Sequence, residues 1–175
     1  MRVVRWFSVP ALLLAMLAFS APSAHAAPIL VYQAFLSGAG ENPPNGSPGT
    51  GYGTVTLNGA MTSFDVDLTW SGLTAPASAS HIHGPAPVGM NAPVIFPFAI
   101  TPGTSGHFTG TFAINAQQLG WLQDGLLYMN IHDANFPAGE IRGQLTATPE
   151  PASLILLSTG LLGVGRYARR RYRSR

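Results

Sequence analysis

Apolar and polar residues alternate along much of the middle of the chain, and this period of two restricts the fold more than any other feature. Residues 63–70 (SFDVDLTW) place four apolar side chains on one face and two aspartates and a threonine on the other, as in a half-buried antiparallel strand. Six similar runs are separated by glycine, proline or asparagine: 29–36, 51–57, 94–100, 107–114, 126–132 and 140–147. About seven such strands predict an all-β fold, a sandwich or a barrel, and we expect an antiparallel β-sandwich.

One segment carries helical signals instead. Asn115 is followed three residues later by Gln118, which is the arrangement of a capping box, and Asp124-Gly125 ends the apolar stretch that follows. We therefore predict one or two helical turns between them. Two further stretches, 37–50 and 84–93, are rich in glycine and proline, and we expect them to be loops.

The charges are unevenly distributed along the chain. The whole sequence has nine basic and seven acidic residues, a net charge of +2, but eight of the nine arginines lie in the first five or the last ten residues. Between residues 28 and 148, Arg142 stands alone against six carboxylates, a net charge of −5. This acidic balance argues against a nucleic-acid-binding surface on the folded part.

The chain has 175 residues and no cysteine. This length is enough for one domain of ordinary size. The lack of cysteine excludes disulfide bonds, thiolate metal ligands and a cysteine nucleophile. The fold must therefore be stabilised by apolar packing, with or without a metal ion or a partner.

Residues 1–26 have the parts of a secretory signal peptide. A short positive start is followed by the apolar run 7–21, and Ala24-His25-Ala26 has the small-x-small pattern of a cleavage site. We predict cleavage by signal peptidase after Ala26. The protein is therefore expected to be exported.

The end of the chain, residues 148–175, combines three features. Pro149-Glu150-Pro151 comes first, the apolar stretch 152–165 follows, and six arginines lie in the last ten residues. The apolar stretch is shorter than the roughly 20 residues that span a bilayer comfortably, but a basic block directly after it is typical of a cytoplasmic membrane boundary. We therefore expect a short transmembrane helix, with the preceding domain outside the cytoplasm.

In order and spacing, this segment resembles the PEP-CTERM sorting signal of Gram-negative bacteria. The resemblance implies that the protein is held transiently in the inner membrane until an exosortase-type protease removes the signal close to Pro149-Glu150-Pro151. It also implies a destination in the cell envelope, at the surface or in the extracellular matrix. Glu150 and its flanking prolines would then be a recognition tag for another enzyme.

Three histidines of the predicted domain are candidate metal ligands. His81 and His83 are two residues apart, so on a strand both imidazoles point to the same side. His132 ends another predicted strand and is followed by Asp133. Three imidazoles near a carboxylate suit Zn²⁺ or Cu²⁺. The alternative is that these histidines are structural and tie loops to the sheet by hydrogen bonds.

Arg142 is the second chemically distinctive residue. It shares a predicted strand face with Glu140, and Glu41 lies in a proline-containing loop after the first strand. A single arginine among carboxylates is typical of a structural clasp, in which Arg142 pairs with Glu41, Asp133 or Glu140. No nucleophile or phosphate-binding loop accompanies it, which argues against a catalytic role.

Four blocks together resemble the CHRD domain, first described in the animal protein chordin and widespread in bacteria. These blocks contain Phe35-Leu-Ser-Gly38 with Glu41-x-Pro-Pro44, His81-Ile-His-Gly84, 126–132 (LLYMNIH) and 139–145 (GEIRGQL). Their order and spacing assign residues 28–147 to the domain. The resemblance implies a β-rich domain; it does not imply growth-factor binding, because a bacterial surface protein has no counterpart of that ligand.

The expected role is non-catalytic. We expect the domain to bind a surface protein or a polysaccharide, and the alternative is a metal-binding or redox protein that uses His81, His83 and His132. A looser likeness to Cu/Zn superoxide dismutase rests on the His-x-His strand. The predicted domain has too few histidines for a two-metal site with a bridging imidazole, so we do not expect an enzyme.

Overall fold

The computed structural model describes residues 30–148, together with 159–162, 164 and 169. The predicted signal peptide with Ala24 and Ala26 lies outside these residues, as do Pro149, Glu150 and Pro151. Most of the expected transmembrane helix does too, and residues 159–162 of it are helical. Among the described residues, no helix has the length and apolar character that crossing a membrane requires.

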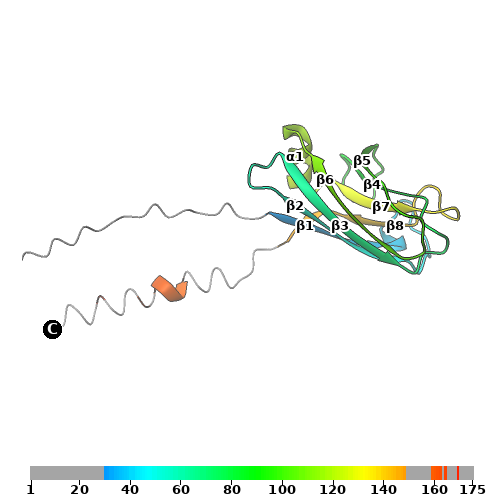
Figure 1. Cartoon of the computed structure of the whole chain (residues 1–175), viewed down its shortest axis with the longest axis horizontal. Coiled ribbons are helices and arrows are strands. Elements are labelled where there is room, and N and C mark those ends of the chain that lie inside the picture. The colour runs from blue at the N-terminus through cyan, green and yellow to red at the C-terminus, as the bar shows by residue number, and fades with distance from the viewer. Residues whose placement is uncertain (1–29, 149–158, 163, 165–168, 170–175) are drawn as a thin grey trace, which may run out of the picture.

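The domain is built almost entirely from strands, as the alternation predicts. Nine strands, one α-helix and one short 3₁₀ helix follow in chain order (Figure 1): β1 Val31–Ser37, η1 Gly38–Gly40, β2 Thr50–Leu57, β3 Ser63–Ser71, β4 Ala79–His83, β5 Val94–Phe98, β6 Gly106–Ala113, α1 Ala116–Gln123, β7 Tyr128–His132, β8 Ile141–Gln144 and β9 Thr146–Ala147. The predicted helix is confirmed with its capping box, in which Asn115 accepts a hydrogen bond from the backbone of Gln118. The predicted strand at 140–147 is divided into β8 and β9.

All the strand pairs are antiparallel, and they form one continuous sheet instead of the expected two-sheet sandwich. The strand order is β5-β4-β7-β8-β1-β2-β3-β6, with β9 paired to β1. The sheet curls until its two edge strands, β5 and β6, face each other through the stacked rings of Phe98 and Phe108, whose centroids are 4.7 Å apart. A curled sheet hides its apolar face without a second sheet, so the fold is a nearly closed barrel.

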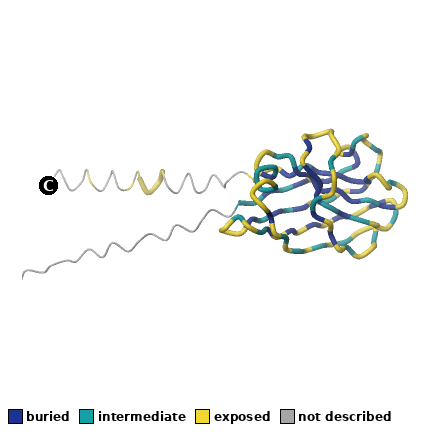
Figure 2. The backbone as a smooth tube through the Cα atoms, turned by 90° about the horizontal axis from the view of Figure 1, so that it is seen from above, coloured by how far each residue is buried: buried dark blue, intermediate teal, exposed yellow. Residues whose placement is uncertain are grey.

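The barrel interior is filled by the apolar positions of the alternating strands. Phe64, Val66, Leu68 and Trp70 of β3 are all buried, while the residues between them are exposed. Figure 2 shows this alternation of buried and exposed positions along the strands. Helix α1 contributes Leu122 to the same core. Packing of this apolar surface is the main stabilising contribution in a chain that has no disulfide bond.

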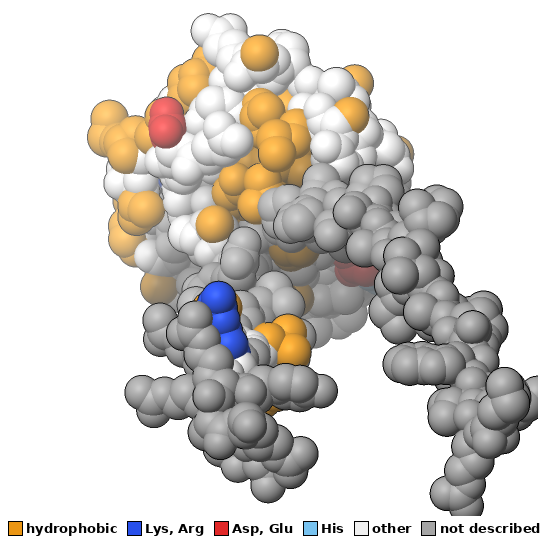
Figure 3. Space-filling view, turned by 90° about the vertical axis from the view of Figure 1, so that its left-hand side faces the viewer, with side chains coloured by type: hydrophobic (Ala, Val, Ile, Leu, Met, Phe, Trp, Pro, Cys, Tyr) orange, Lys and Arg blue, Asp and Glu red, His pale blue; other side chains and the backbone are white. Residues whose placement is uncertain are grey.

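The two ends of the domain lie side by side. Tyr32 near the start of β1 pairs with Ala147 at the end of β9, at the left-hand side of Figure 1. Figure 3 views the domain from that side and shows hydrophobic side chains gathered on its surface. The segments before and after the domain therefore begin from neighbouring points.

Candidate metal centre

The three candidate histidines meet on the outer face of two neighbouring strands. In the β4–β7 pair, His83 lies opposite Tyr128, His81 opposite Asn130, and His132 opposite Ala79. Residues that face each other across antiparallel strands share one face of the sheet. The intervening residues, such as Ile82 and Ile131, are buried in the core. The histidines therefore point away from the barrel interior, and one potential ligand nitrogen of each lies within 4.8 Å of the other two.

Backbone carbonyls fix the protonation of two of the rings. The Nδ1 of His83 lies 2.9 Å from the Ala92 oxygen, and the Nδ1 of His132 lies 3.0 Å from the Pro137 oxygen. A carbonyl oxygen only accepts, so each Nδ1 carries the proton and each Nε2 keeps its lone pair. Carbonyls that hold one nitrogen of an imidazole while the other faces a metal are typical of the surroundings of metal ligands.

Three of the four remaining ring nitrogens are buried and have no hydrogen-bond partner among the described residues. They are Nδ1 of His81, Nε2 of His83 and Nε2 of His132. A buried polar atom is normally hydrogen-bonded, so three orphaned nitrogens together need an explanation. Nitrogens bound to one tetrahedral zinc ion lie about 3.4 Å apart, and the candidate ligand atoms of the three rings lie within 4.8 Å of one another. The cluster can therefore hold a metal ion. The alternative role, tying loops to the sheet, uses only the other nitrogen of His83 and of His132.

The site holds its imidazoles in the neutral form that binds metals. Burial, reinforced by repulsion from His132 and His83, lowers the pKa of His81 to about 4. Burial also lowers the pKa of His83 and of His132, although the carbonyls of Ala92 and Pro137 oppose this shift. Protons therefore compete weakly with a metal ion at neutral pH.

The residues that form this site belong to blocks that a family comparison recognises. The model of the CHRD domain matches residues 32–145, nearly the whole barrel. The chain belongs to the CHRD domain family. The model of the PEP-CTERM protein-sorting motif matches residues 147–171, directly after the CHRD domain. No match was found among curated proteins or among solved structures.

Two loops cover the outer face of the CHRD domain beside the histidines. They are the expected loops 37–50, which includes η1, and 84–93. They are joined where the side-chain amide of Asn91 donates to the Asn42 oxygen at 3.1 Å. The first loop is also tied to the strand region after Pro137, because Asn45 donates to the carbonyl oxygens of Gly139 and Glu140. These contacts fix the two loops to each other and to the sheet.

Arg142 lies under this cover and is only 2% exposed. Its guanidinium donates to the Met90 oxygen at 2.9 Å and to Oδ1 of Asn91 at 3.2 Å, and it packs on the ring of Tyr128. Its partners therefore differ from the predicted carboxylates. The one ion pair within the described ranges is His107–Asp67, on an exposed part of the sheet. Arg142 holds the second loop, which the sequence could not indicate because Met90 contributes only a backbone atom.

Glu41 is buried close to Arg142 but is bound by another residue. Its Oε1 accepts a hydrogen bond of 2.6 Å from the side-chain amide of Asn130. Burial raises the pKa of Glu41 to about 7, although the positive charge of Arg142 opposes the shift. Glu41 therefore feels the field of Arg142 without forming the predicted pair with it.

Glu140 is fully buried and faces a carboxylate, not an arginine. It accepts hydrogen bonds from Oγ of Ser47 at 2.6 Å and from the backbone of Thr74 at 2.8 Å. Burial and a hydrogen bond with Asp133 raise the pKa of Glu140. Burial also acts on Asp133, but hydrogen bonds from Glu140 and from backbone N–H groups outweigh it and lower the pKa of Asp133. A proton shared by these two carboxyl groups is therefore held more readily by Glu140 than by Asp133.

Tyr128 is a site residue that the sequence reasoning missed. Its ring stacks on that of His83, with a centroid distance of 4.9 Å and an interplanar angle of 2°. Its hydroxyl oxygen accepts a hydrogen bond of 3.1 Å from the Ala92 backbone, the residue whose carbonyl holds His83. The available signal was the position of Tyr128 four residues before His132 on one alternating strand.

Proposed function

We propose that this exported CHRD domain protein binds a transition-metal ion, zinc or copper, through His81, His83 and His132. The observation that carries the proposal is the convergence of three buried ring nitrogens that lack hydrogen-bond partners. The role is binding and not catalysis. What supports this is that no nucleophile or phosphate-binding loop accompanies the cluster in the sequence.

The sorting motif at residues 147–171 implies export and processing by an exosortase. The proposed export route has three steps. Signal peptidase cleaves after Ala26, the inner membrane holds the protein transiently, and an exosortase then cleaves near Pro149-Glu150-Pro151. The processed CHRD domain then resides in the cell envelope, at the surface or in the extracellular matrix. There it carries a net charge of about −5, since the arginine-rich ends have been removed.

The test is the metal content of the exported protein after purification and dialysis. Elemental analysis should find close to one equivalent of zinc or copper. A strong chelator should lower the melting temperature, because an ion that binds only the folded state stabilises it. Less than about 0.1 equivalent of metal, together with an unchanged melting temperature in chelator, would contradict the proposal.

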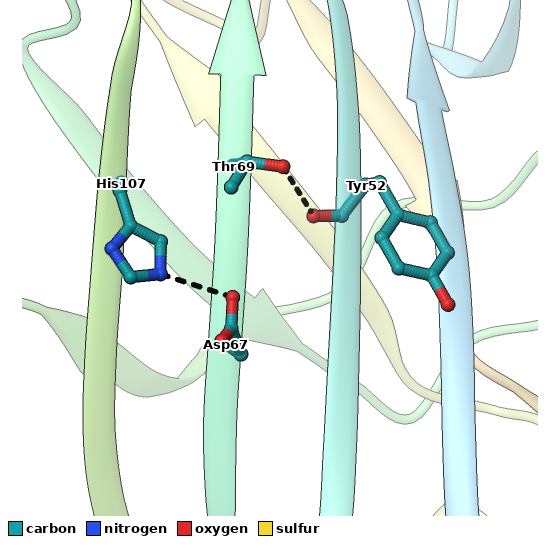
Figure 4. Close-up of polar contacts among 4 residues, drawn as sticks. All are labelled: Tyr52, Asp67, Thr69 and His107. Atoms are coloured by element: carbon teal, nitrogen blue, oxygen red, sulfur yellow. Dashed lines mark hydrogen bonds and ion pairs between the residues drawn. The ribbon is translucent and has the colours of Figure 1, made fainter.

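A second candidate function is binding of a polysaccharide on the outer face of β1, β2, β3 and β6. Phe35 is 70% exposed and Tyr52 is 41% exposed, and their ring centroids are 5.1 Å apart. Figure 4 shows Tyr52 beside Thr69, Asp67 and His107 of the neighbouring strands, a face of hydroxyl, carboxylate and imidazole groups. Exposed aromatic rings beside such groups can stack on sugar rings. Loss of polysaccharide binding in the Tyr52→Ala variant, with the metal site intact, would support this candidate.

A further inference from the structure

A buried positive charge lies one aromatic ring away from the three-histidine site. The guanidinium carbon of Arg142 is 3.4 Å from the centre of the Tyr128 ring, and Tyr128 stacks in parallel on His83. Because β7 lies between β4 and β8 in the sheet, Tyr128 separates the two groups. Arg142 is almost fully buried, so water screens its charge weakly.

The site offers no negative charge among its ligands. The only ligand atoms that come together in the described part of the chain are the three imidazole nitrogens. Asp133 follows His132, but N–H groups of Ala75 and Phe136 hold its carboxylate. Glu41 is held by Asn130. The charges that influence the pKa of His81 and His83 are those of the other histidines and of Arg142, and all of them disfavour added positive charge.

We propose that the three-histidine site selects the monovalent ion Cu(I) over the divalent ions Zn²⁺ and Cu²⁺. This inference rests on the proposed metal-binding function and specifies the charge of the ion that the site prefers.

Two physical effects favour the monovalent ion. Repulsion from the fixed charge of Arg142 grows in proportion to the charge of the ion, so a divalent ion meets twice the penalty. The cost of transferring an ion from water into a buried site grows with the square of its charge, and no carboxylate ligand offsets it here.

The experiment changes the field of Arg142 without removing Arg142, whose loss could unfold the domain. Asn91 is exposed, and its Oδ1 accepts a hydrogen bond from Arg142 at 3.2 Å. The Asn91→Asp variant places a carboxylate of nearly the same shape there, which pairs with the guanidinium and opposes its charge. It also loses the hydrogen bond from the Asn91 amide to the Asn42 oxygen, just as the control below loses an amide donor to Thr62. The matched control is Asn58→Asp, which adds the same charge at the exposed β2–β3 turn.

The measurements use the full-length exported protein. Cu(I) is supplied under anaerobic conditions and Zn²⁺ in a separate experiment, and in each the protein competes with a chelator for the ion. We expect the unmodified protein and Asn58→Asp to bind Cu(I) more tightly than Zn²⁺. Asn91→Asp should shift the ratio of the two affinities toward Zn²⁺ by about tenfold. If the ratio of the Cu²⁺ affinity to the Cu(I) affinity also rises tenfold, the midpoint potential of the bound copper falls by about 59 mV.

Each outcome gives a distinct answer. Tighter binding of Zn²⁺ than of Cu(I) by the unmodified protein would overturn this inference but leave the proposed metal-binding function standing. An unchanged affinity ratio in Asn91→Asp would overturn the role given to Arg142. Failure to bind either ion would overturn the proposed function and this inference with it.

Discussion

The guanidinium carbon of Arg142 lies 3.4 Å from the centre of the Tyr128 ring, under two surface loops. The same guanidinium donates a hydrogen bond to the Met90 oxygen. Arg142 therefore connects β7, the strand that carries the candidate ligand His132, to the loop that covers this strand. The single cation of the folded domain therefore acts as a structural link between β8, Tyr128 and the loop.

Replacing Arg142 should destabilise the domain substantially. Arg142→Ala removes the stacking on Tyr128 and leaves the Met90 oxygen without its donor, so we expect a loss of about 2–4 kcal/mol in the free energy of unfolding. Arg142→Lys keeps the charge but loses the planar fork and should lose about half as much. Urea unfolding monitored by tryptophan fluorescence measures both. A loss below about 0.5 kcal/mol for Arg142→Ala would show that the residue is dispensable for the fold.

Gly139 should tolerate no side chain. Its φ is +139°, and an added Cβ would lie 2.6 Å from Oε1 of Glu41 and 2.5 Å from Nδ2 of Asn130. Gly139→Ala should therefore strain the backbone and separate the Glu41–Asn130 pair, with an expected loss of about 2–4 kcal/mol. Gly46→Ala is the control, because no atom lies within 4 Å of its added Cβ. Equal unfolding free energies for the two variants would contradict this account.

Much of the fold could be predicted from the sequence, because burial and strand periodicity are local signals. The alternation along 63–70 gave the correct face for every residue of β3, and Asn115 and Gln118 gave the correct helix start. Strand β4 was not among the seven predicted strands, since its neighbourhood is rich in alanine and serine, which are poor strand markers. Closure into one sheet depends on contacts such as Phe98–Phe108, which no local pattern reveals.

The candidate site could be predicted only in part, for the same reason. His81 and His83 share a face by strand geometry alone, but their proximity to His132 depends on the β4–β7 register. The predicted partners of Arg142 were carboxylates, since charge was the only clue in the sequence. The structure instead supplies a backbone oxygen, an amide and an aromatic ring. Sequence does not show which backbone atoms a loop presents.

The metal-free protein should lose stability in mild acid. Burial and neighbouring histidines lower the pKa of His81 to about 4 from 6.5, so between these values the unfolded chain binds more protons than the folded one. The free energy of unfolding should therefore fall as the pH decreases from 6.5 to 4. His83 and His132 shift in the same direction. Glu41 acts in the opposite direction. Its pKa is raised to about 7 in the folded state, so the stability that its protonated form contributes is lost as the pH rises through 7.

Urea unfolding at several pH values in chelator measures this slope. His81→Gln should reduce the loss between pH 6.5 and 4, and Glu41→Gln should increase it by removing the opposing contribution. Equal slopes in all three proteins would show that neither group titrates differently in the folded and unfolded states.

Replacing one ligand should remove the metal without unfolding the domain. His81 is partly exposed at the rim of the cluster, and its buried Nδ1 has no partner, so His81→Gln removes a ligand and breaks no hydrogen bond that the structure shows. We expect the bound metal to fall from about one equivalent to below about 0.1, because two imidazoles hold such an ion weakly. His107→Gln is the matched control, since His107 is exposed, pairs with Asp67 and is not a member of the cluster. Elemental analysis of the dialysed variants, with circular dichroism to verify folding, decides the outcome. Metal retained in His81→Gln, or lost equally in His107→Gln, would place the ion elsewhere on the protein.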